Sequence, residues 1–180
     1  MYIETFFISK NKNNLIKTVA IQGVKGSFHH IVSQDYFGEQ TAVNECLSFD
    51  ETVEALLSGK TEAAIMALEN SIAGSIIPNY ALIDANNLHI VGEHYLDIQH
   101  NLMALPNQTI QDVKEVYSHP MALLQCKVFF KNYPHIKLVE DKDTAEVAQR
   151  ISQGKIKGIA AIASSLAASI FKLDILAESI

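Results

Sequence analysis

The sequence is poor in positive charge and contains a single arginine. Its 180 residues hold 14 Lys and Arg against 20 Asp and Glu, which gives a formal net charge of -6. A broad nucleic-acid surface depends on clustered Lys and Arg that neutralise phosphates, and this composition argues against such a surface. We therefore expect a small-molecule ligand.

Cysteine is also scarce, and long apolar runs are absent. Cys46 and Cys126 lie far apart and lack the spacing of a metal or redox motif, which predicts two buried, reduced thiols. No apolar run approaches the roughly 20 residues needed to span a bilayer. The first residues, MYIETFFISKNKNNLIK, contain no basic leader and no cleavage pattern. These absences predict a cytoplasmic protein in which residues 1–18 form an N-terminal extension.

What the sequence does contain is an alternation of short apolar runs with amphipathic stretches from Lys17 onward. This pattern is typical of βα units that feed a largely parallel sheet. In the stretch IVGEHYLDIQHNLMALP, two extended segments follow each other without a helix-length spacer, so we expect the chain to cross there from one lobe to another. The prediction is an α/β protein with a first lobe at 19–98, a second lobe at 99–180 and a ligand cleft between them. The predicted strands are KTVAIQ, AVNECL, EAAIMAL, LHIVGEHYLDI, NLMAL, EVY, IKLVE, GIAAIA and DILAE.

Several of these strands end in small or polar residues that are predicted to open a helix. A helix start presents unpaired N–H groups and roughly half a positive charge, so several starts that converge on one cleft could hold a carboxylate-bearing ligand. The alternative is that each cap is purely structural, because every βα protein needs caps. The residues at these junctions are Gly23, Gly26 and Ser27; Glu69, Asn70 and Ser71; Ser118 as N-cap with Pro120 in the first turn; and Asp143 or Thr144 as cap with Glu146.

Three other features favour ordinary structural roles. His29 and His30 are adjacent, so on a helix they point about 100° apart and form a poor chelating pair, and surface or cap positions are expected. Arg150 lies in an amphipathic stretch, where a solvated helix face is expected. The segment GVKGSF lacks the Gly-Lys-Ser/Thr ending of a phosphate-binding loop. We predict no metal site.

Taken in order, the segments resemble those of the prephenate dehydratase catalytic domain. GVKGSF is similar to the family's Gly-Pro-x-Gly-Thr-Phe, ALENSIAGSI to its Ile-Glu-Asn-Ser segment, and IQHNLMA, with His100, to its Ile-x-His-x-Leu segment. VYSHPMALLQC resembles Val-Tyr-Ser-His-Pro-x-Ala-Leu-x-Gln-Cys almost residue for residue. DTAEVA resembles Ser-Thr-Ala-Glu-Ala-Ala with Asp143 in place of serine, and GIAAIASSLAASIFKLDILAESI resembles the closing helix and strand. The likeness runs from about Val19 to Ile180.

The resemblance implies a two-lobed α/β fold like that of type II periplasmic binding proteins, with mixed, mostly parallel sheets and helices on both faces. It implies a site between the lobes without metal or organic cofactor, and the conversion of prephenate to phenylpyruvate, carbon dioxide and water in phenylalanine biosynthesis. It also implies association into a dimer or tetramer, and no nucleic-acid or membrane partner is expected. The substrate-binding residues carried over are Ser27, Phe28, Glu69, Asn70, Ser71, Ser118, His119, Gln125 and Thr144, with support of the turn at Ser118 as the favoured role of His119.

One family segment is not found in the sequence. A Thr-Arg-Phe, whose threonine is thought to assist hydroxyl departure and whose arginine grips the substrate, normally follows shortly after the counterpart of ILAESI. We expect the second lobe, 99–180, to be truncated before the return to the first lobe. We therefore assign no catalytic residue, and we expect weaker activity than in a longer form that retains this segment. A phenylalanine-sensing regulatory domain is not found either, so no feedback inhibition is predicted. The alternatives are a carboxylate-binding sensor module without catalysis, and action on arogenate, the amino analogue of prephenate.

Overall fold

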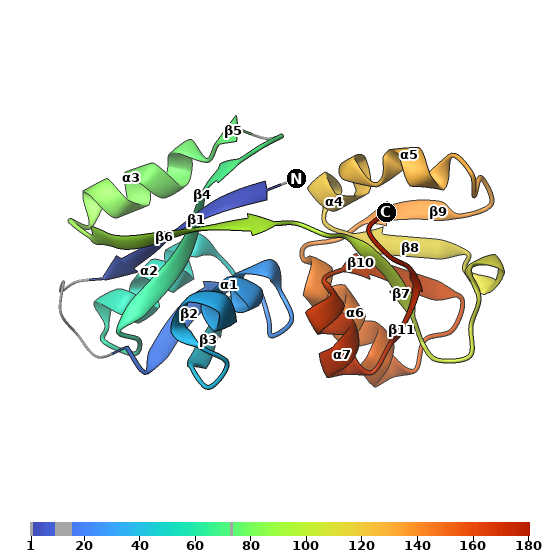
Figure 1. The fold of residues 1–180 in the computed structure, drawn as a ribbon, viewed down its shortest axis with the longest axis horizontal. Helices are drawn as coiled ribbons and strands as arrows, with labels where there is room; N and C mark the ends of the chain where they lie inside the picture. Colours follow the sequence, from blue (N-terminus) through green and yellow to red (C-terminus); the bar gives the residue numbers. More distant parts are fainter. Residues whose placement is uncertain (1, 10–15, 73) are drawn as a thin grey trace. The chain divides into compact units, whose positions relative to one another are not determined.

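The computed structural model describes residues 2–9, 16–72 and 74–180. The chain forms two compact units, Met1–Ile98 and Gln99–Ile180, and each has its own sheet with helices packed against it (Figure 1). The predicted fold class, an α/β protein with mixed sheets, is confirmed. Each of the nine predicted strands overlaps a strand of the structure.

The first unit contains a mixed sheet in the order β3-β2-β4-β1-β6, with the short β5 paired to β4. Strands β2, β3 and β4 are parallel, whereas β1 runs antiparallel to both β4 and β6. The strands are β1 (Tyr2–Ser9), β2 (Thr18–Gln22), β3 (Ala42–Cys46), β4 (Ala63–Asn70), β5 (Gly74–Ser75) and β6 (His89–Asp97). The helices are α1 (Phe28–Phe37), α2 (Phe49–Leu57) and α3 (Ile77–Ala85).

Strand β4 is buried on both faces, because helices cover the sheet from each side. Met66 and Leu68 belong to a core shared with α2 and α3. Ile65, which points the opposite way, belongs to a second core with Val32 of α1. A continuous apolar run of this kind is what a sheet covered on both faces requires.

Strand β1 lies within the segment that was predicted to be an N-terminal extension. It is hydrogen-bonded to β4 along one edge and to β6 along the other (Figure 1). Phe7 and Ile8 are fully buried, one in each core. Residues 2–9 are therefore part of the first sheet, and the prediction differs from the structure because strand pairing at long range leaves no local sequence signal. Residues 10–15 of the predicted extension lie outside the described residues.

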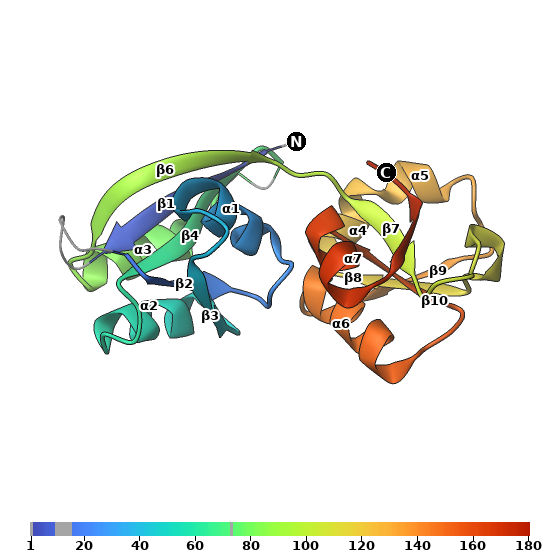
Figure 2. The ribbon, with the colours of Figure 1, turned by 60° about the horizontal axis from the view of Figure 1, so that its bottom comes forward.

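The second unit contains a mixed sheet in the order β11-β7-β10-β8-β9. Strands β8, β9 and β10 are parallel, and β7 is antiparallel to β10 and β11. Helices α4 and α5 cover one face of this sheet, and α6 and α7 cover the other (Figures 1 and 2). The strands are β7 (Asn101–Ala104), β8 (Glu115–Ser118), β9 (Lys137–Glu140), β10 (Ile159–Ala163) and β11 (Asp174–Ala177). The helices are the 3-10 turn η1 (Ile110–Asp112), α4 (Pro120–Gln125), α5 (Lys127–Phe130), α6 (Thr144–Gly154) and α7 (Ser165–Phe171).

The two cysteines are free and buried, as predicted, and they lie in different units. Burial raises the pKa of the Cys126 thiol to about 12 and also raises that of Cys46. Neither thiol is therefore a nucleophile near neutral pH. In the described part of the chain, no helix has the length and apolar character that crossing a membrane requires.

Candidate functional site

The polar residues predicted at helix starts gather at the carboxyl edge of each sheet. In the first unit, the parallel strands β2, β3 and β4 end at one edge. The chain beyond them starts α1, starts α2, and forms the β4–β5 hairpin, respectively. In open α/β sheets, ligands bind at such an edge.

Helix α1 begins at Ser27, as the sequence predicts. The Ser27 side chain accepts a hydrogen bond from the His30 N–H at 3.3 Å. Gly26 precedes it with φ 92°, a conformation that favours glycine, and the Gly26 N–H donates to His30 Nδ1 at 3.0 Å. Phe28 is the first helical residue and is half-buried. The segment thus forms a fixed helix start, whose first-turn N–H groups point to the strand-end edge.

Surface or cap positions were predicted for the adjacent histidines. Both are buried, so a surface position is wrong, whereas His30 does bond the backbone at the start of α1. His29 is 9% exposed and His30 is 8% exposed. The His29 Nδ1–H donates to the carbonyl of Gln22 at 3.1 Å, and its ring meets the ring of Phe49 edge-on. Burial lowers the pKa of His29 to about 4, and burial together with the charge of Lys25 lowers that of His30. Both rings are therefore neutral near pH 7 and support the helix start from inside the fold.

Asn70 ends a strand and does not open a helix, which corrects the prediction for this segment. Strand β4 continues to Asn70, whose Oδ1 accepts from the Ile72 N–H at 2.9 Å. This is a side-chain-supported turn, and the exposed Ser71 lies within it. The next helix, α3, starts later at Ile77 and has no side-chain cap.

Glu69 is held by two hydroxyl groups from beyond the turn. Its carboxylate accepts from Tyr80 Oη at 2.7 Å and from Ser75 Oγ at 3.0 Å. The side chain is half-buried. Glu69 therefore fixes the hairpin against α3, and its negative charge is directed into these hydrogen bonds.

A pocket of about 560 Å³ lies beside the start of α2. Ser48 caps this helix by accepting from the Glu51 N–H at 3.2 Å, and Glu51 Oε2 accepts from the Leu47 N–H at 2.8 Å. The start of α2 was not predicted from the sequence, although Ser48-x-x-Glu51 is the sequence signature of a capping box. The pocket is lined by Gln22, Leu47, Ser48, Phe49, Asp50, Pro78, Asn79, Ala81 and Leu82.

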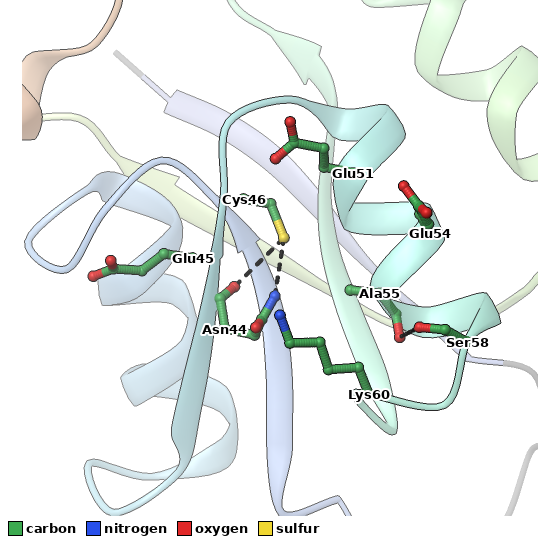
Figure 3. Close-up of a pocket in the computed structure, with 8 residues that line it drawn as sticks. All are labelled: Asn44, Glu45, Cys46, Glu51, Glu54, Ala55, Ser58 and Lys60. Atoms are coloured by element: carbon green, nitrogen blue, oxygen red, sulfur yellow. Dashed lines mark hydrogen bonds between the residues drawn. The ribbon is translucent and has the colours of Figure 1, made fainter.

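A second pocket of about 250 Å³ lies between β3 and α2 (Figure 3). Cys46 Sγ accepts from Asn44 Nδ2 at 3.2 Å inside it. The lining residues are Asn44, Glu45, Cys46, Glu51, Glu54, Ala55, Ser58 and Lys60. With three carboxylates and one ammonium group, this pocket is unsuited to an anion, and none of the predicted site residues lines it. No His, Cys, Asp and Glu cluster suited to a metal ion occurs among residues 2–9, 16–72 and 74–180.

In the second unit, Ser118 ends β8 but does not cap the helix that follows. His119 is the N-cap of α4, and its Nδ1 accepts from the Met121 N–H at 3.2 Å. Ser118 is fully buried, and its Oγ donates to the carbonyl of Ile162 at 2.8 Å, which ties β8 to β10. The predicted cap is corrected: proline fixes the residue before it as the cap, and His119 occupies that position. Pro120 does lie in the first turn.

Helix α6 begins beside the same strand end. Its N-cap is Asp143, whose Oδ1 accepts from the Glu146 N–H at 2.8 Å, and Thr144 is its first residue. Burial raises the pKa of Asp143, while that hydrogen bond and the charge of His119 act in the opposite direction. The Asp141 N–H also donates to the carbonyl of Ser118 at 2.9 Å.

Gln125, the last residue of α4, is half-buried and paired with a buried histidine. Its Oε1 lies 2.7 Å from Nε2 of His100, which is 5% exposed. Sequence reasoning noted His100 only as part of a motif. Its pairing with Gln125 depends on the end of α4 lying next to the start of β7. This is a tertiary contact that the local sequence does not indicate.

Arg150 lies on the exposed side of α6 and is already engaged. Its Nη2 donates to Asp141 Oδ2 at 2.6 Å, and its guanidinium lies 5.7 Å from the ring centre of Tyr117. The expected exposure of Arg150 is confirmed. A ligand carboxylate would have to compete with Asp141 for this group.

The structure therefore places the predicted residues at the strand-end edge of their own unit, in two separate groups in the first unit and around two helix starts in the second. In the first unit these are Ser27 and Phe28 at the start of α1, and Glu69, Asn70 and Ser71 at the β4–β5 turn. In the second unit these are Ser118, His119 and Thr144 around two helix starts, with Gln125 at the far end of α4.

Residues 19–180 match the family model for prephenate dehydratase. A bifunctional chorismate mutase/prephenate dehydratase of Buchnera aphidicola subsp. Schizaphis graminum is 33% identical over 174 residues, which cover 94% of this chain and 45% of that protein. An arogenate dehydratase/prephenate dehydratase 2 of Arabidopsis thaliana is 38% identical over 162 residues, which cover 90% of this chain and 42% of that protein. The chain thus spans less than half the length of these relatives.

Among solved structures, a quorum-quenching acylase named GqqA superposes with a TM-score of 0.82 at 30% identity. The superposition covers 91% of this chain and 59% of the acylase. The fold is therefore shared with a protein described by a different activity.

Proposed function

The chain belongs to the prephenate dehydratase family, and we propose that it carries the family reaction, in which prephenate loses carbon dioxide and water to give phenylpyruvate. The observation that carries this proposal is the family match over residues 19–180, which spans both sets of helix starts. Phenylalanine biosynthesis in the cytoplasm is the proposed setting, with association into a dimer or tetramer.

The demands of the reaction fit the groups that each unit offers. The C–C bond to the ring carboxylate breaks, carbon dioxide leaves, and the bonding electrons complete the aromatic ring as the C–O bond on the opposite carbon breaks. The departing hydroxide takes one proton from a general acid, to which we assign no residue, and leaves as water. The product is aromatic, so the protein has mainly to hold two carboxylates and orient the ring. Helix N–H groups can hold carboxylates without cationic side chains, which suits an acidic chain whose single arginine is paired with Asp141.

We propose that the start of α1, at Ser27 and Phe28, is a carboxylate-binding position of the first unit. We propose separately that the start of α6, at Thr144, is a carboxylate-binding position of the second unit. Gln125 and the exposed His119 would then contact the ring substituents. Glu69, Asn70 and Ser71 would shape the wall of the site through the β4–β5 turn. Ser118 would act indirectly, because its hydroxyl is committed to Ile162.

Arogenate is the second candidate substrate, because the Arabidopsis relative is named for both activities. Acyl transfer is less well supported. The Ser118 hydroxyl donates to a carbonyl and not to an imidazole, whereas a serine nucleophile needs an adjacent base. A two-lobed carboxylate-binding module without catalysis is the remaining alternative.

Incubation of the 180-residue chain with each substrate separates these candidates. Ultraviolet absorbance of phenylpyruvate is expected with prephenate, and phenylalanine would appear if arogenate is used. Heat release on mixing without product would indicate a binding module. Neither heat nor product with prephenate or arogenate, together with hydrolysis of an acyl amide, would contradict the proposal.

A further inference from the structure

A buried histidine and a half-buried glutamine form a hydrogen-bonded pair in the second unit. His100 lies just before β7, and Gln125 ends α4. We propose that His100 is a positioning residue, whose ring N–H holds the side-chain oxygen of Gln125 so that the amide NH₂ is directed to the substrate. This proposal rests on the function proposed above.

The chemistry of the amide explains why such a partner matters. A glutamine side chain offers an oxygen that only accepts and a nitrogen that only donates, and a half-turn about its last bond exchanges them. An oxygen turned to a carboxylate or hydroxyl-bearing anion would repel it, whereas the NH₂ would donate to it. The 2.7 Å contact from His100 Nε2 to Gln125 Oε1 selects the second arrangement.

The protonation of the ring is consistent with this role. Burial lowers the pKa of His100, although the hydrogen bond to Gln125 acts to raise it. Near neutral pH the ring is then neutral and carries one N–H. The site of that proton decides the orientation of the amide, so the geometry requires the Nε2–H tautomer.

Both partners are attached to ordered backbone. The carbonyl of His100 accepts from the Ile180 N–H at 2.9 Å, and Cys126, next to Gln125, donates from Sγ to the carbonyl of Ile180 at 3.7 Å. Leu123 and Cys126 are buried in the core of the second unit. A donor whose support is locked in this way loses little freedom when substrate binds.

Substitutions at His100 separate positioning from simple structural support. His100→Met removes the donor at similar volume and is expected to raise KM for prephenate about 10-fold to 100-fold, the range for a hydrogen bond to a charged group. His100→Gln keeps an N–H near the position of Nε2 and is expected to restore KM to within about threefold of the wild type. The double variant His100→Met, Gln125→Met is expected to match Gln125→Met alone, because His100 acts only through Gln125.

Ser152→Ala supplies the matched control for lost stability. It removes a hydrogen bond from Ser152 Oγ to the carbonyl of Phe171 in the same unit and is expected to lower the melting temperature without changing KM. Equal KM changes in His100→Gln and His100→Met, or multiplicative effects in the double variant, would overturn the positioning role.

A spectroscopic readout decides the question independently of turnover. Long-range proton–nitrogen NMR correlations of the His100 ring are expected to show the Nε2–H tautomer. Nδ1–H would mean that the amide is reversed, and the inference would fail even if the chain were active. Conversely, Nε2–H in a chain that neither binds nor converts prephenate would leave the fixed amide intact and contradict the proposed function instead.

Discussion

The two units place histidine at a helix start in different ways. In the first unit, His29 and His30 lie within α1, are buried, and hold the preceding loop through Gln22 and Gly26. In the second unit, His119 precedes α4, is exposed, and forms the cap itself. The difference teaches that packing around a helix start decides the role of an imidazole. The first start can offer backbone N–H groups, whereas the second can also offer a side chain.

The buried helix start of the first unit depends on β1, because α1 packs against this strand. The ring of Phe7 stacks on Tyr36 with centroids 3.7 Å apart and meets Phe37 edge-on at 5.0 Å. Phe7→Ala is expected to destabilise the first unit by about 3–5 kcal/mol, the usual cost of a large cavity in a core. Hydrogen exchange followed by mass spectrometry would detect the loss of protection over residues 16–98.

Val128→Ala serves as the control for this substitution. Val128 is 71% exposed, and its truncation is expected to change stability by less than about 0.5 kcal/mol. Unchanged protection of the first unit in Phe7→Ala would show that β1 is not an integral strand.

The buried histidine predicts an acid sensitivity of the first unit. The pKa of His29 is about 4 in the folded chain against 6.5 for an ordinary histidine. Titration of His29 therefore leaves the free energy of unfolding unchanged above pH 6.5. As pH falls from 6.5 toward 4, the unfolded chain binds a proton at His29 before the folded chain does, and the free energy of unfolding falls by about 3 kcal/mol. Denaturant unfolding at a series of pH values would measure this slope.

His29→Asn tests whether His29 is the source of that slope. Asparagine can donate to the Gln22 carbonyl but does not titrate in this range. The variant is expected to be less stable at pH 7 and to show a flatter pH dependence between 6.5 and 4. An equally steep slope in the variant would assign the sensitivity to other groups.

The smallest expected effect concerns the caps. Asp143→Ala removes the side-chain acceptor at the start of α6 and is expected to cost about 1 kcal/mol, and Ser27→Ala is expected to cost a similar amount in α1. Asp143→Asn keeps an acceptor and is expected to retain most of that stability. Thermal melts of the three variants would check the order, and a loss in Asp143→Asn as large as in Asp143→Ala would contradict the capping role.

Local patterns were sufficient for much of the fold. Runs such as AAIMAL and GIAAIA predict buried strands because both faces are covered, and Ser27 and Asp143 are predictable caps because their short side chains can reach back to a first-turn N–H. The Ser48-x-x-Glu51 pattern carried the same kind of signal, and the start of α2 could have been predicted from it.

Features that depend on distant partners could not be predicted in the same way. The pairing of β1 with β4 and β6, the packing of the His29 ring on Phe49 and the contact of His100 with Gln125 each join residues distant in sequence. The helix predicted to start at Asn70 was wrong for a related reason. The Asn70 side chain can support either a helix start or a turn, and hydrogen bonds from Tyr80 and Ser75 to Glu69 favour the turn.

The most direct test of the account is an NMR titration of the chain with prephenate. Amide shifts are expected at the first turn of α1, residues 28–30, at the first turn of α6, residues 144–146, and at the side-chain NH₂ of Gln125, together with the formation of phenylpyruvate. Shifts confined to the Cys46 pocket, with no product, would contradict the claim that these helix starts bind the carboxylates of the substrate.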